Sequence, residues 1–288
     1  MSFTTLIEAS VLRDLIGKPD LAVIDCRFDL SNRSRGRAAY LEGHIPGAKY
    51  ADLETDLSGP VTAKSGRHPL PAPEDFAAAL ERWGIGSATQ VIVYDDAGGS
   101  FAARAWWLLR WLGHKSVAVL DGGMKAWIAA EGLLEPGEAR PSQERIPSDG
   151  RIAPKSDRAA LIETADIERF LANPANLLVD ARAAERFAGS VEPIDTVAGH
   201  IGGAANHPFS TNLGQDGRFL PAAELRRLWE LRLAGRKPER VAAMCGSGVT
   251  ACHNLLSLEV AGLSGAKLYA GSWSEWIRDP NRAVARGP

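Results

Sequence analysis

Cys245 lies in a stretch, VAAMCGSGVTA, in which an apolar run gives way to glycines and then to a helical pattern. The apolar run before Cys245 predicts a buried strand, and the residues that follow the loop 246–250 predict a helix. A cysteine at such a junction lies among loop N–H groups and at the positive end of the helix dipole, and both stabilise a negatively charged sulfur. Gly246 and Gly248 allow the tight backbone that this arrangement needs. The pattern predicts a reactive nucleophile, although a free cysteine is more often a small buried apolar residue.

The rest of the loop also suits an anion. Ser247 and Thr250 add hydroxyl donors to the backbone N–H groups of the loop. We expect Ser247 to be a catalytic residue beside the nucleophile. We expect the substrate-binding residues of the loop to be Gly246, Gly248, Val249 and Thr250. These donors would stabilise negative charge on a sulfur carried by the cysteine or on a departing group.

The composition of the chain argues against several classes of function. Its 288 residues contain 33 Lys and Arg against 35 Asp and Glu, so the net charge of -2 gives no support for nucleic-acid or membrane binding. We see no apolar run long enough to span a bilayer and no signal peptide. Three cysteines are an odd number for a disulfide framework and favour a reducing, cytoplasmic environment. We expect no metal site and no cofactor.

The elements that position the loop come from an internal repeat. Four motifs of the first half return in order and at nearly equal spacing: LAVIDCRF as LLVDARAAERF, GHIPGA as GHIGGA, VIVYDD as VAAMCG, and LDGGMKAW as YAGSWSEW. The repeat predicts a duplicated domain. We place an N-terminal domain at residues 1–135, a surface linker rich in Pro, Gly, Ser and charge at 136–157, and a C-terminal domain at 158–288. The position that matches Cys245 in the first copy is Asp95, which cannot take up sulfur.

Each copy is predicted to be an α/β domain. The runs 21–24, 91–94 and 117–120 are continuously apolar, as is typical of strands buried in a parallel sheet. Helical patterns lie between them, such as PEDFAAALERWG, which begins with Pro73 and acids and ends at Gly84. This alternation predicts helices on both faces of each sheet. Ligands of such sheets bind beyond the carboxyl ends of the strands, which is the expected place of the cysteine loop.

The loop CGSGVTA, together with VDAR, GHIGGA and the ending GSWSEW, resembles the sulfurtransferases that contain tandem rhodanese-like domains. It looks most like the loop of 3-mercaptopyruvate sulfurtransferases, because thiosulfate sulfurtransferases typically carry basic residues there. The resemblance implies an inactive N-terminal copy and an active C-terminal copy. It implies that Cys245 takes sulfur from 3-mercaptopyruvate, releases pyruvate, and holds a persulfide. A thiol acceptor, such as thioredoxin or a small thiol, or cyanide then removes the sulfur.

The resemblance also implies further site residues. Arg186 matches the arginine that binds the donor carboxylate. His68 and Glu54 match a histidine and an acid that are proposed to work with Ser247 in moving a proton. The alternative for His68 is a structural histidine that caps or packs a loop. A second carboxylate-binding arginine of the mercaptopyruvate enzymes, in an EPR-like segment, has no counterpart in VEPIDTVAGH. Either another residue supplies this charge from a different loop, or the preference for mercaptopyruvate is weaker.

Several other conspicuous residues have structural interpretations. His44 and His200 occur in the GHI turns of both copies, including the copy that lacks the cysteine. We therefore expect them to support the turns. Arg182 is expected to form a structural ion pair, and Cys26 and Cys252 are expected to pack in the interior.

Three alternative functions fit parts of the sequence. A cysteine phosphatase also binds an anion in a loop after a strand, but it needs an arginine six positions after the cysteine, where this chain has Ala251. A thiosulfate:cyanide sulfurtransferase differs only in its donor, and the absence of Lys and Arg from residues 246–251 disfavours a dianion. A non-catalytic persulfide-carrier module would accept sulfur from a partner enzyme and would not need the second arginine.

Overall fold

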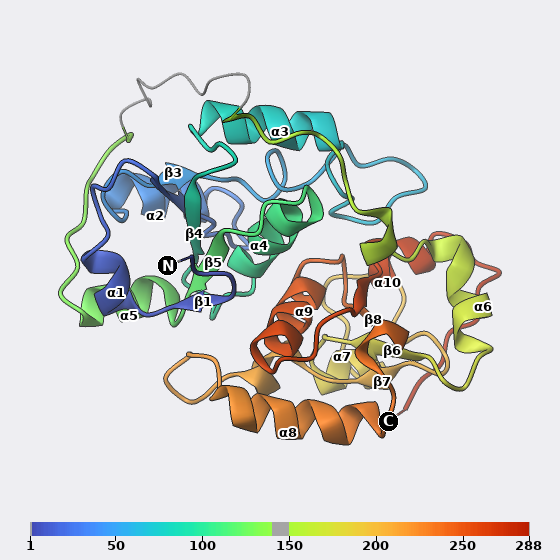
Figure 1. Ribbon diagram of the computed structural model, residues 1–288. Helices are drawn as coiled ribbons and strands as arrows, with labels where there is room; N and C mark the ends of the chain where they lie inside the picture. Colours follow the sequence, from blue (N-terminus) through green and yellow to red (C-terminus); the bar gives the residue numbers. More distant parts are fainter. Residues whose placement is uncertain (1, 140–149, 288) are drawn as a thin grey trace. The chain divides into compact units, whose positions relative to one another are not determined.

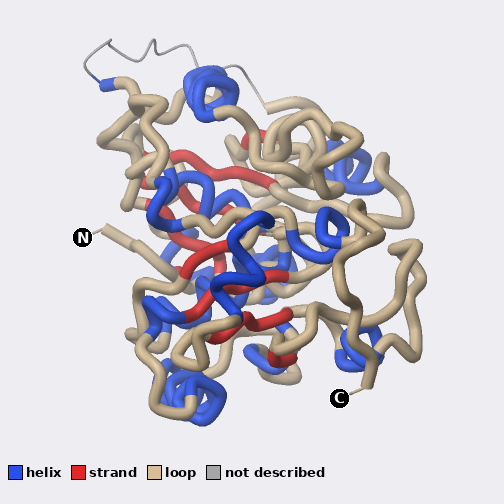
Figure 2. The backbone as a smooth tube through the Cα atoms, turned by 90° about the vertical axis from the view of Figure 1, so that its right-hand side faces the viewer, coloured by secondary structure: helices blue, strands red, loops and turns tan. Residues whose placement is uncertain are grey.

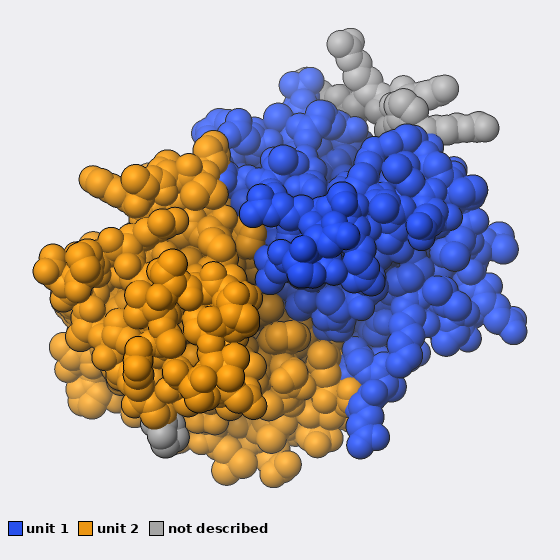
Figure 3. All heavy atoms as spheres, turned by 180° about the vertical axis from the view of Figure 1, so that it is seen from behind, with its two compact units in different colours: residues 1–59, 71–157, 215–218 blue, residues 60–70, 158–214, 219–288 orange. Residues whose placement is uncertain are grey.

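The computed structural model describes residues 2–139 and 150–287 and divides into two compact units (Figure 3). Unit 1 comprises residues 1–59, 71–157 and 215–218, and unit 2 comprises residues 60–70, 158–214 and 219–288. Each unit therefore includes a short segment from the other half of the chain. The proposed domain boundaries at residues 135 and 158 stay a prediction. Residues 140–149 of the predicted linker lie outside the described residues.

Unit 1 contains a parallel sheet with the strand order β1-β5-β4-β2-β3. Its strands are β1 (Leu6–Ile7), β2 (Leu21–Asp25), β3 (Lys49–Tyr50), β4 (Gln90–Tyr94) and β5 (Val117–Leu120). Its helices are α1 (Ala9–Arg13), α2 (Arg35–Glu42), α3 (Pro73–Arg82), α4 (Ala102–Trp111) and α5 (Gly123–Ala129) (Figure 1). The three apolar runs predicted as strands are confirmed, since they form β2, β4 and β5.

Unit 2 contains a second parallel sheet with the strand order β7-β6-β8-β9. Its strands are β6 (Leu177–Asp180), β7 (Ala205–Asn206), β8 (Val241–Met244) and β9 (Lys267–Leu268). Its α-helices are α6 (Ile167–Leu171), α7 (Ala184–Ala188), α8 (Ala222–Leu233), α9 (Thr250–Val260) and α10 (Ser272–Trp276). Short 3-10 turns are η2 (Arg158–Ala160), η3 (Thr164–Asp166), η4 (Phe209–Asn212) and η5 (Pro238–Arg240). Figure 2 colours the strands red, the helices blue and the long loops that connect them tan.

The two sheets repeat one topology. The order β3-β2-β4-β5 in unit 1 corresponds to β7-β6-β8-β9 in unit 2. In unit 1 the strand β1 pairs with β5 at the edge of the sheet. At the same place in unit 2 a single parallel bridge joins Leu161 to Leu268. The internal repeat predicted from the sequence motifs therefore corresponds to a repeated sheet.

A buried ion pair is repeated after the first central strand of each unit. Arg27 makes hydrogen bonds of 2.6–3.0 Å to the carboxylate of Asp25, and Arg182 makes hydrogen bonds of 2.7–3.1 Å to that of Asp180. Each guanidinium also donates a 2.8 Å hydrogen bond to a glycine carbonyl oxygen in the GHI turn. The structural ion pair expected for Arg182 is thus confirmed.

The histidines of the two GHI turns also have equivalent surroundings. Nδ1 of His44 lies 2.9 Å from the carbonyl oxygen of Tyr40, and Nδ1 of His200 lies 2.9 Å from that of Phe187. Each imidazole stacks on the ring of the same partner, with centroids 4.1 and 3.8 Å apart. Both histidines are buried and support their turns, as the sequence predicts.

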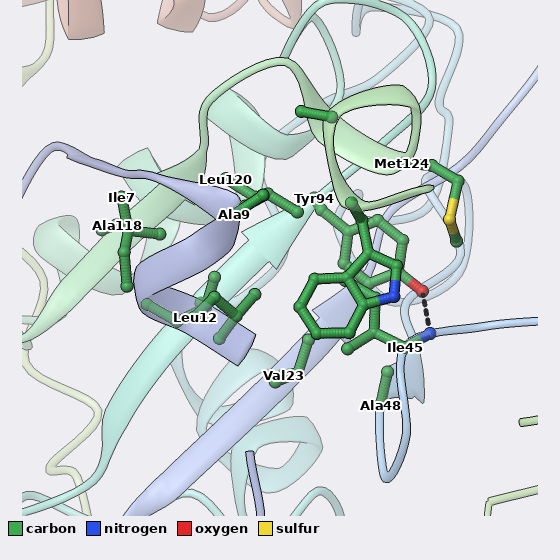
Figure 4. Packing of buried hydrophobic residues seen from close by; sticks show 13 residues of the cluster. Ile7, Ala9, Leu12, Val23, Ile45, Ala48, Tyr94, Ala118, Leu120 and Met124 are labelled. Carbon is green, nitrogen blue, oxygen red and sulfur yellow. Dashed lines mark hydrogen bonds between the residues drawn. The ribbon is translucent and has the colours of Figure 1, made fainter. Parts of the chain in front are cut away.

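Helices cover both faces of the sheet in unit 1. Helices α1 and α5 pack on one face, and α4 contacts β4 and β5 from the other side. Figure 4 shows the core on the first face, where the Tyr94 hydroxyl accepts a 3.2 Å hydrogen bond from the backbone N–H of Ile45. That core is formed by Ile7, Ala9, Leu12, Val23, Ile45, Ala48, Ile92, Tyr94, Ala118, Leu120, Met124, Ala126 and Trp127.

The sheet of unit 2 is covered in the same way. Helices α6 and α10 contribute to a core on one face, and α9 contacts β8 and β9, with α8 packed against α9. The core includes Met244, which precedes the cysteine, and Trp273 of α10. Fully burying an apolar side chain contributes about 1.5–3 kcal/mol, so this core fixes the end of β8, which precedes the loop, and the helix α10. The predicted α/β class with helices on both faces is confirmed in both units.

Neither a membrane-spanning helix nor a metal-binding cluster occurs in the described part of the chain. Within residues 2–139 and 150–287, no helix combines the length and the apolar character needed to cross a membrane. Within the same residues, no group of three or more His, Cys, Asp or Glu side chains is arranged to hold a metal ion.

Candidate active site

Cys245 directly follows β8, and the loop that it opens leads into α9. The sulfur atom accepts hydrogen bonds from the backbone N–H groups of Ser247, at 3.4 Å, and Gly248, at 3.1 Å. Only 2% of the Cys245 surface is exposed. Two N–H donors that converge on one sulfur, in front of a helix N-terminus, favour negative charge on that atom.

The shape of the loop depends on its glycines. Gly248 has a φ angle of +78°, and a Cβ atom at this position would lie 2.4 Å from the carbonyl oxygen of Ala270. No other residue fits this place without moving the backbone. A Cβ atom on Gly246 would lie 2.9 Å from Nη2 of Arg67 and 3.5 Å from Nη2 of Arg186.

Helix α10 holds the loop from one side. The backbone N–H groups of Trp273 and Ser274 donate to the carbonyl oxygens of Cys245 and Gly246, at 3.0 and 2.9 Å. The N–H of Cys245 in turn donates to the hydroxyl of Ser272, at 3.0 Å. Ser272 has a φ of +54°, which is unusual for a residue other than glycine and is held here by two hydrogen bonds of its hydroxyl.

The segment 60–70, which belongs to unit 2, is attached to the same helix. The backbone N–H of Gly66 donates to the carboxylate of Glu275 at 3.3 Å, and that of Arg67 donates to the Ser274 hydroxyl at 3.0 Å. Ser274 therefore connects the segment with the cysteine loop. The following residue, His68, is buried, and its Nδ1 lies 2.8 Å from the Ser247 hydroxyl oxygen.

The structure thus brings together Ser247 and His68, two of the three residues in the predicted relay. The third, Glu54, belongs to unit 1, where it forms a 3.2 Å ion pair with the exposed Arg33. The complete relay stays a prediction. Of the other predicted loop residues, Val249 is buried with 4% of its surface exposed, and Thr250 is the first residue of α9.

Arg186, on α7, lies beside the cysteine loop and is held by two acids. Its guanidinium binds the carboxylate of Glu192 with hydrogen bonds of 2.8–3.2 Å and that of Asp195 at 3.1 Å. Both acids come from the segment VEPID. This segment lacks the second carboxylate-binding arginine that the resemblance implies. The sequence analysis missed these acids because nothing in their spacing marks them as partners of α7.

The sequence analysis also missed Arg67. Its Nη1 forms an ion pair with the carboxylate of Asp195, and its Nη2 faces Gly246. Its position beside His68 in SGRHPLP was the available signal, because adjacent residues of one segment reach the same site. A second guanidinium therefore lies beside the loop, and it comes from a different segment of the chain.

The two acids respond differently to their surroundings. Burial opposes ionisation of Glu192, but hydrogen bonds from Arg186 and from backbone N–H groups outweigh it and lower the pKa of Glu192. Burial raises the pKa of Asp195 and the charge of Glu192 adds to this, while Arg67 and Arg186 act in the opposite direction.

The matching loop of unit 1 holds a carboxylate in place of the sulfur. Asp95 is fully buried, and its two oxygens accept hydrogen bonds of 2.8–2.9 Å from four backbone N–H groups, those of Ala97, Gly99, Phe101 and Ala102. Burial raises the pKa of Asp95, and these four donors act against that rise. The donors of this loop are thus already used by the protein's own anion.

The other two cysteines lie in the interior. Cys26 is buried, and burial together with nearby acids raises its pKa well above the ordinary value. Cys252 is buried on α9, where its thiol donates to the carbonyl oxygen of Gly248 at 3.3 Å. Both agree with the packing role that the sequence predicts.

Comparisons with known proteins give one consistent result. The rhodanese-like domain family matches residues 8–130 and 163–279. A probable 3-mercaptopyruvate sulfurtransferase from Pseudomonas aeruginosa is 51% identical over 289 residues, covering 100% of both chains. A putative thiosulfate sulfurtransferase from Mycobacterium tuberculosis is 40% identical over 287 residues, covering 98% of this chain and 97% of its own.

Solved structures agree with these relatives. The crystal structure of a 3-mercaptopyruvate sulfotransferase from Escherichia coli superposes with a TM-score of 0.79 at 34% sequence identity. The match covers 94% of this chain and 100% of that one.

Proposed function

Because this chain belongs to the rhodanese-like domain family, with two domains in tandem, we propose that it transfers sulfur from 3-mercaptopyruvate to a thiol or to cyanide. Cys245 is the nucleophile of this reaction. The observation that carries the proposal is the sulfur atom of Cys245, which accepts two backbone N–H groups beside two guanidinium groups. Curated relatives and structures with this activity in their names support the choice of donor.

In the first half-reaction the Cys245 sulfur attacks the sulfur of the donor. An S–S bond forms, the C–S bond breaks, and its electron pair passes to carbon as the enolate of pyruvate. The proton of the Cys245 thiol ends on that carbon, so the products are a persulfide, Cys245–S–SH, and pyruvate. The N–H groups that face the sulfur stabilise its negative charge during attack.

In the second half-reaction the outer sulfur leaves the enzyme. Cyanide attacks it, the S–S bond breaks, and thiocyanate and the Cys245 thiol result. A thiol acceptor takes the same sulfur and becomes a persulfide. Two half-reactions through a covalent intermediate predict ping-pong kinetics.

Ser247 and His68 have a role in proton movement in this proposal. The 2.8 Å contact between the imidazole and the hydroxyl gives a path by which a proton can reach the donor. Glu54 is proposed to complete the relay. Arg186 binds the carboxylate of the donor, and Gly246, Gly248, Val249 and Thr250 line its site.

Thiosulfate is the alternative donor, and the Mycobacterium tuberculosis relative is the observation that favours it. The absence of Lys and Arg between Gly246 and Ala251 speaks against a dianion at the loop. A non-catalytic persulfide carrier is a further alternative. We propose a cytoplasmic location and, as the physiological acceptor, thioredoxin or a small thiol.

The test compares the two donors on the purified protein. Pyruvate and thiocyanate are measured with 3-mercaptopyruvate and cyanide, and thiocyanate alone with thiosulfate and cyanide. The proposal expects a higher kcat/KM for mercaptopyruvate, and it expects no turnover by the Cys245→Ser variant. A higher kcat/KM for thiosulfate would replace the donor. The absence of turnover with both donors, combined with sulfur loading from a partner enzyme, would indicate a carrier.

A further inference from the structure

One carboxylate joins the two guanidinium groups beside the cysteine loop. Asp195 binds Arg67 through Oδ1 and Arg186 through Oδ2, the latter at 3.1 Å. Because the two oxygens of one carboxylate are close together, this bridge holds the two guanidinium groups side by side. Glu192 fixes Arg186 from a second direction, with hydrogen bonds to its Nε and Nη2.

The arginines are accessible and the acids are not. The side chains of Arg67 and Arg186 are 26% and 17% exposed, whereas those of Asp195 and Glu192 are each 4% exposed. The acids therefore lie beneath the guanidinium groups and position them, and a solute meets the guanidinium groups first.

Both guanidinium groups face the residue after the nucleophile. A Cβ atom on Gly246 would lie 2.9 Å from Nη2 of Arg67 and 3.7 Å from Nη1 of Arg186. Within the described residues, Nε of Arg67 is buried and donates to no protein acceptor. A buried donor of this kind is unfavourable by about 1–3 kcal/mol unless a ligand or water accepts its hydrogen bond. Nε of Arg67 is thus unpaired among the described residues, and Nη2, which faces Gly246, is the atom that an anion at the loop would meet.

We propose that Arg67 is the second donor-binding cation of this enzyme. It binds the carboxylate of the donor together with Arg186, and Asp195 is the positioning residue that holds the pair. This inference rests on the proposed function and extends it to a residue from a segment far from Arg186 in the sequence. It accounts for the missing arginine between Arg186 and His200, because the charge comes from the segment 60–70.

The charges of the cluster also bear on the kind of donor. Glu192 also lies 3.5 Å from Arg182, which is paired with Asp180. The cluster therefore contains three arginines (Arg67, Arg182 and Arg186) and three acids (Asp180, Glu192 and Asp195), so it has no net charge. A neutral cluster with outward-facing donors suits the single carboxylate of an α-keto acid. A dianion such as thiosulfate gains less from it, because the buried acids repel the second charge.

The main experiment measures both half-reactions in Arg67→Ala. In ping-pong kinetics, kcat/KM for the donor reports persulfide formation and kcat/KM for the acceptor reports its removal. We expect kcat/KM for mercaptopyruvate to fall roughly 10- to 100-fold, the effect of losing a hydrogen bond to a charged group, and kcat/KM for cyanide to stay within two-fold. Arg67→Lys should recover part of the loss because it keeps the charge.

The matched control is Arg226→Ala, which removes an exposed arginine paired with Glu230 on α8 of the same unit. It should leave both constants unchanged. A donor constant within two-fold of wild type in Arg67→Ala would overturn the proposal, as would an equal fall of both constants, which indicates damage to the loop.

Asp195→Asn tests the charge argument separately. It removes one negative charge and should raise the ratio of kcat/KM for thiosulfate to that for mercaptopyruvate several-fold. An unchanged or lower ratio would reject the role of net charge in donor choice.

The proposed function and this inference fail in different ways. If the wild-type protein releases no pyruvate from mercaptopyruvate, the proposed function fails. The Arg67 variants are then measured with thiosulfate, and an unchanged kcat/KM there overturns the role of Arg67 as a donor-binding cation. If the wild type releases pyruvate from mercaptopyruvate and the Arg67 variants have the same kcat/KM for this donor, the inference fails and the proposed function stands.

Discussion

The side chain of Arg186 faces the cysteine loop and also forms ion pairs with two buried acids, Glu192 and Asp195. Its Nε and Nη2 bind Glu192, and Nη2 also binds Asp195. Removing it would therefore affect substrate binding and the folded state together. Kinetics alone cannot separate the two effects, whereas stability and kinetics measured together can.

We predict that Arg186→Ala raises KM for mercaptopyruvate about 10-fold or more, because a charge-assisted hydrogen bond to the carboxylate is lost. It should also lower the free energy of unfolding by about 1–3 kcal/mol, since two buried carboxylates lose a partner. Steady-state kinetics and denaturant unfolding measure these effects. An unchanged KM would remove Arg186 from the donor site, whatever happens to stability.

At the scale of elements, the segment 60–70 depends on a close approach of its backbone to α10. A Cβ atom on Gly66 would lie 2.7 Å from the carbonyl oxygen of Gly271 and 2.9 Å from the Ser274 hydroxyl. The first contact is with backbone, so a side chain here must push the segment away. Arg67 and His68 would move with it.

We predict that Gly66→Ala lowers kcat/KM for mercaptopyruvate about 10-fold or more, because both side chains leave their places by the loop. The rate of alkylation of Cys245 by a small neutral reagent should change less than two-fold. Gly202→Ala is the control, since the only atom near a Cβ there is 3.9 Å away and the φ angle is ordinary. Wild-type donor kinetics in Gly66→Ala would show that the segment does not need this close contact.

The loop after β4 in unit 1 and the loop after β8 in unit 2 differ in the group that their backbone N–H groups bind. The loop of unit 1 directs four N–H groups to the two oxygens of Asp95, whereas that of unit 2 directs two to the single sulfur of Cys245. The four N–H donors of unit 1 are thus placed for two carboxylate oxygens, and not for a single sulfur atom.

We predict that Asp95→Cys creates no second active centre. A thiolate would leave some of the four buried N–H groups without an acceptor, each at about 1–3 kcal/mol, so the variant should be less stable and should not hold a persulfide. Sulfur bound after exposure to mercaptopyruvate is measured by reaction with cyanide, and one equivalent per chain is expected. Two equivalents, or one equivalent in the Asp95→Cys/Cys245→Ser double variant, would contradict the prediction.

For the whole molecule, a buried histidine links stability to pH. His207 follows β7, is 5% exposed, and has its Nε2 3.0 Å from Oδ1 of Asn212, with its ring 4.1 Å from that of Trp229. Burial lowers the pKa of His207 from 6.5 to about 4, although the hydrogen bond to Asn212 opposes this. The unfolded chain therefore binds a proton at a higher pH than the folded one.

We predict that stability falls as the pH is lowered from 6.5 to about 4, the window between the two pKa values of His207. The contribution of this residue amounts to about 3 kcal/mol over the full window. Unfolding in guanidinium chloride at several pH values measures it. The His207→Gln variant should show a shallower fall than the wild type, and identical pH slopes in the two proteins would exclude His207 as the cause.

Much of the fold could be predicted because the information was local or repeated. Continuous apolar runs mark buried parallel strands, Pro73 and its acids mark the start of α3, and the four repeated motifs correspond to the repeated topology of the sheets. The place of Cys245 followed from the same reasoning, since a strand, glycines and a helix occur in one short stretch.

The rest of the site could not be predicted because it depends on contacts between distant segments. The place of Arg67 depends on a hydrogen bond to Ser274, and its orientation depends on Asp195, which has no distinctive sequence context. Which residues share a unit is likewise invisible in the order of the chain, as the assignment of residues 60–70 to unit 2 shows.

That assignment has a consequence for protein synthesis. The stretch that carries Arg67 and His68 leaves the ribosome long before Ser274, to which it is attached in the folded protein. A chain that ends before α10 can contain Cys245 but lacks Ser274, which attaches the segment 60–70 to the cysteine loop in the folded protein. For the same reason, dividing the gene between its two repeats would separate the cysteine from groups that surround it.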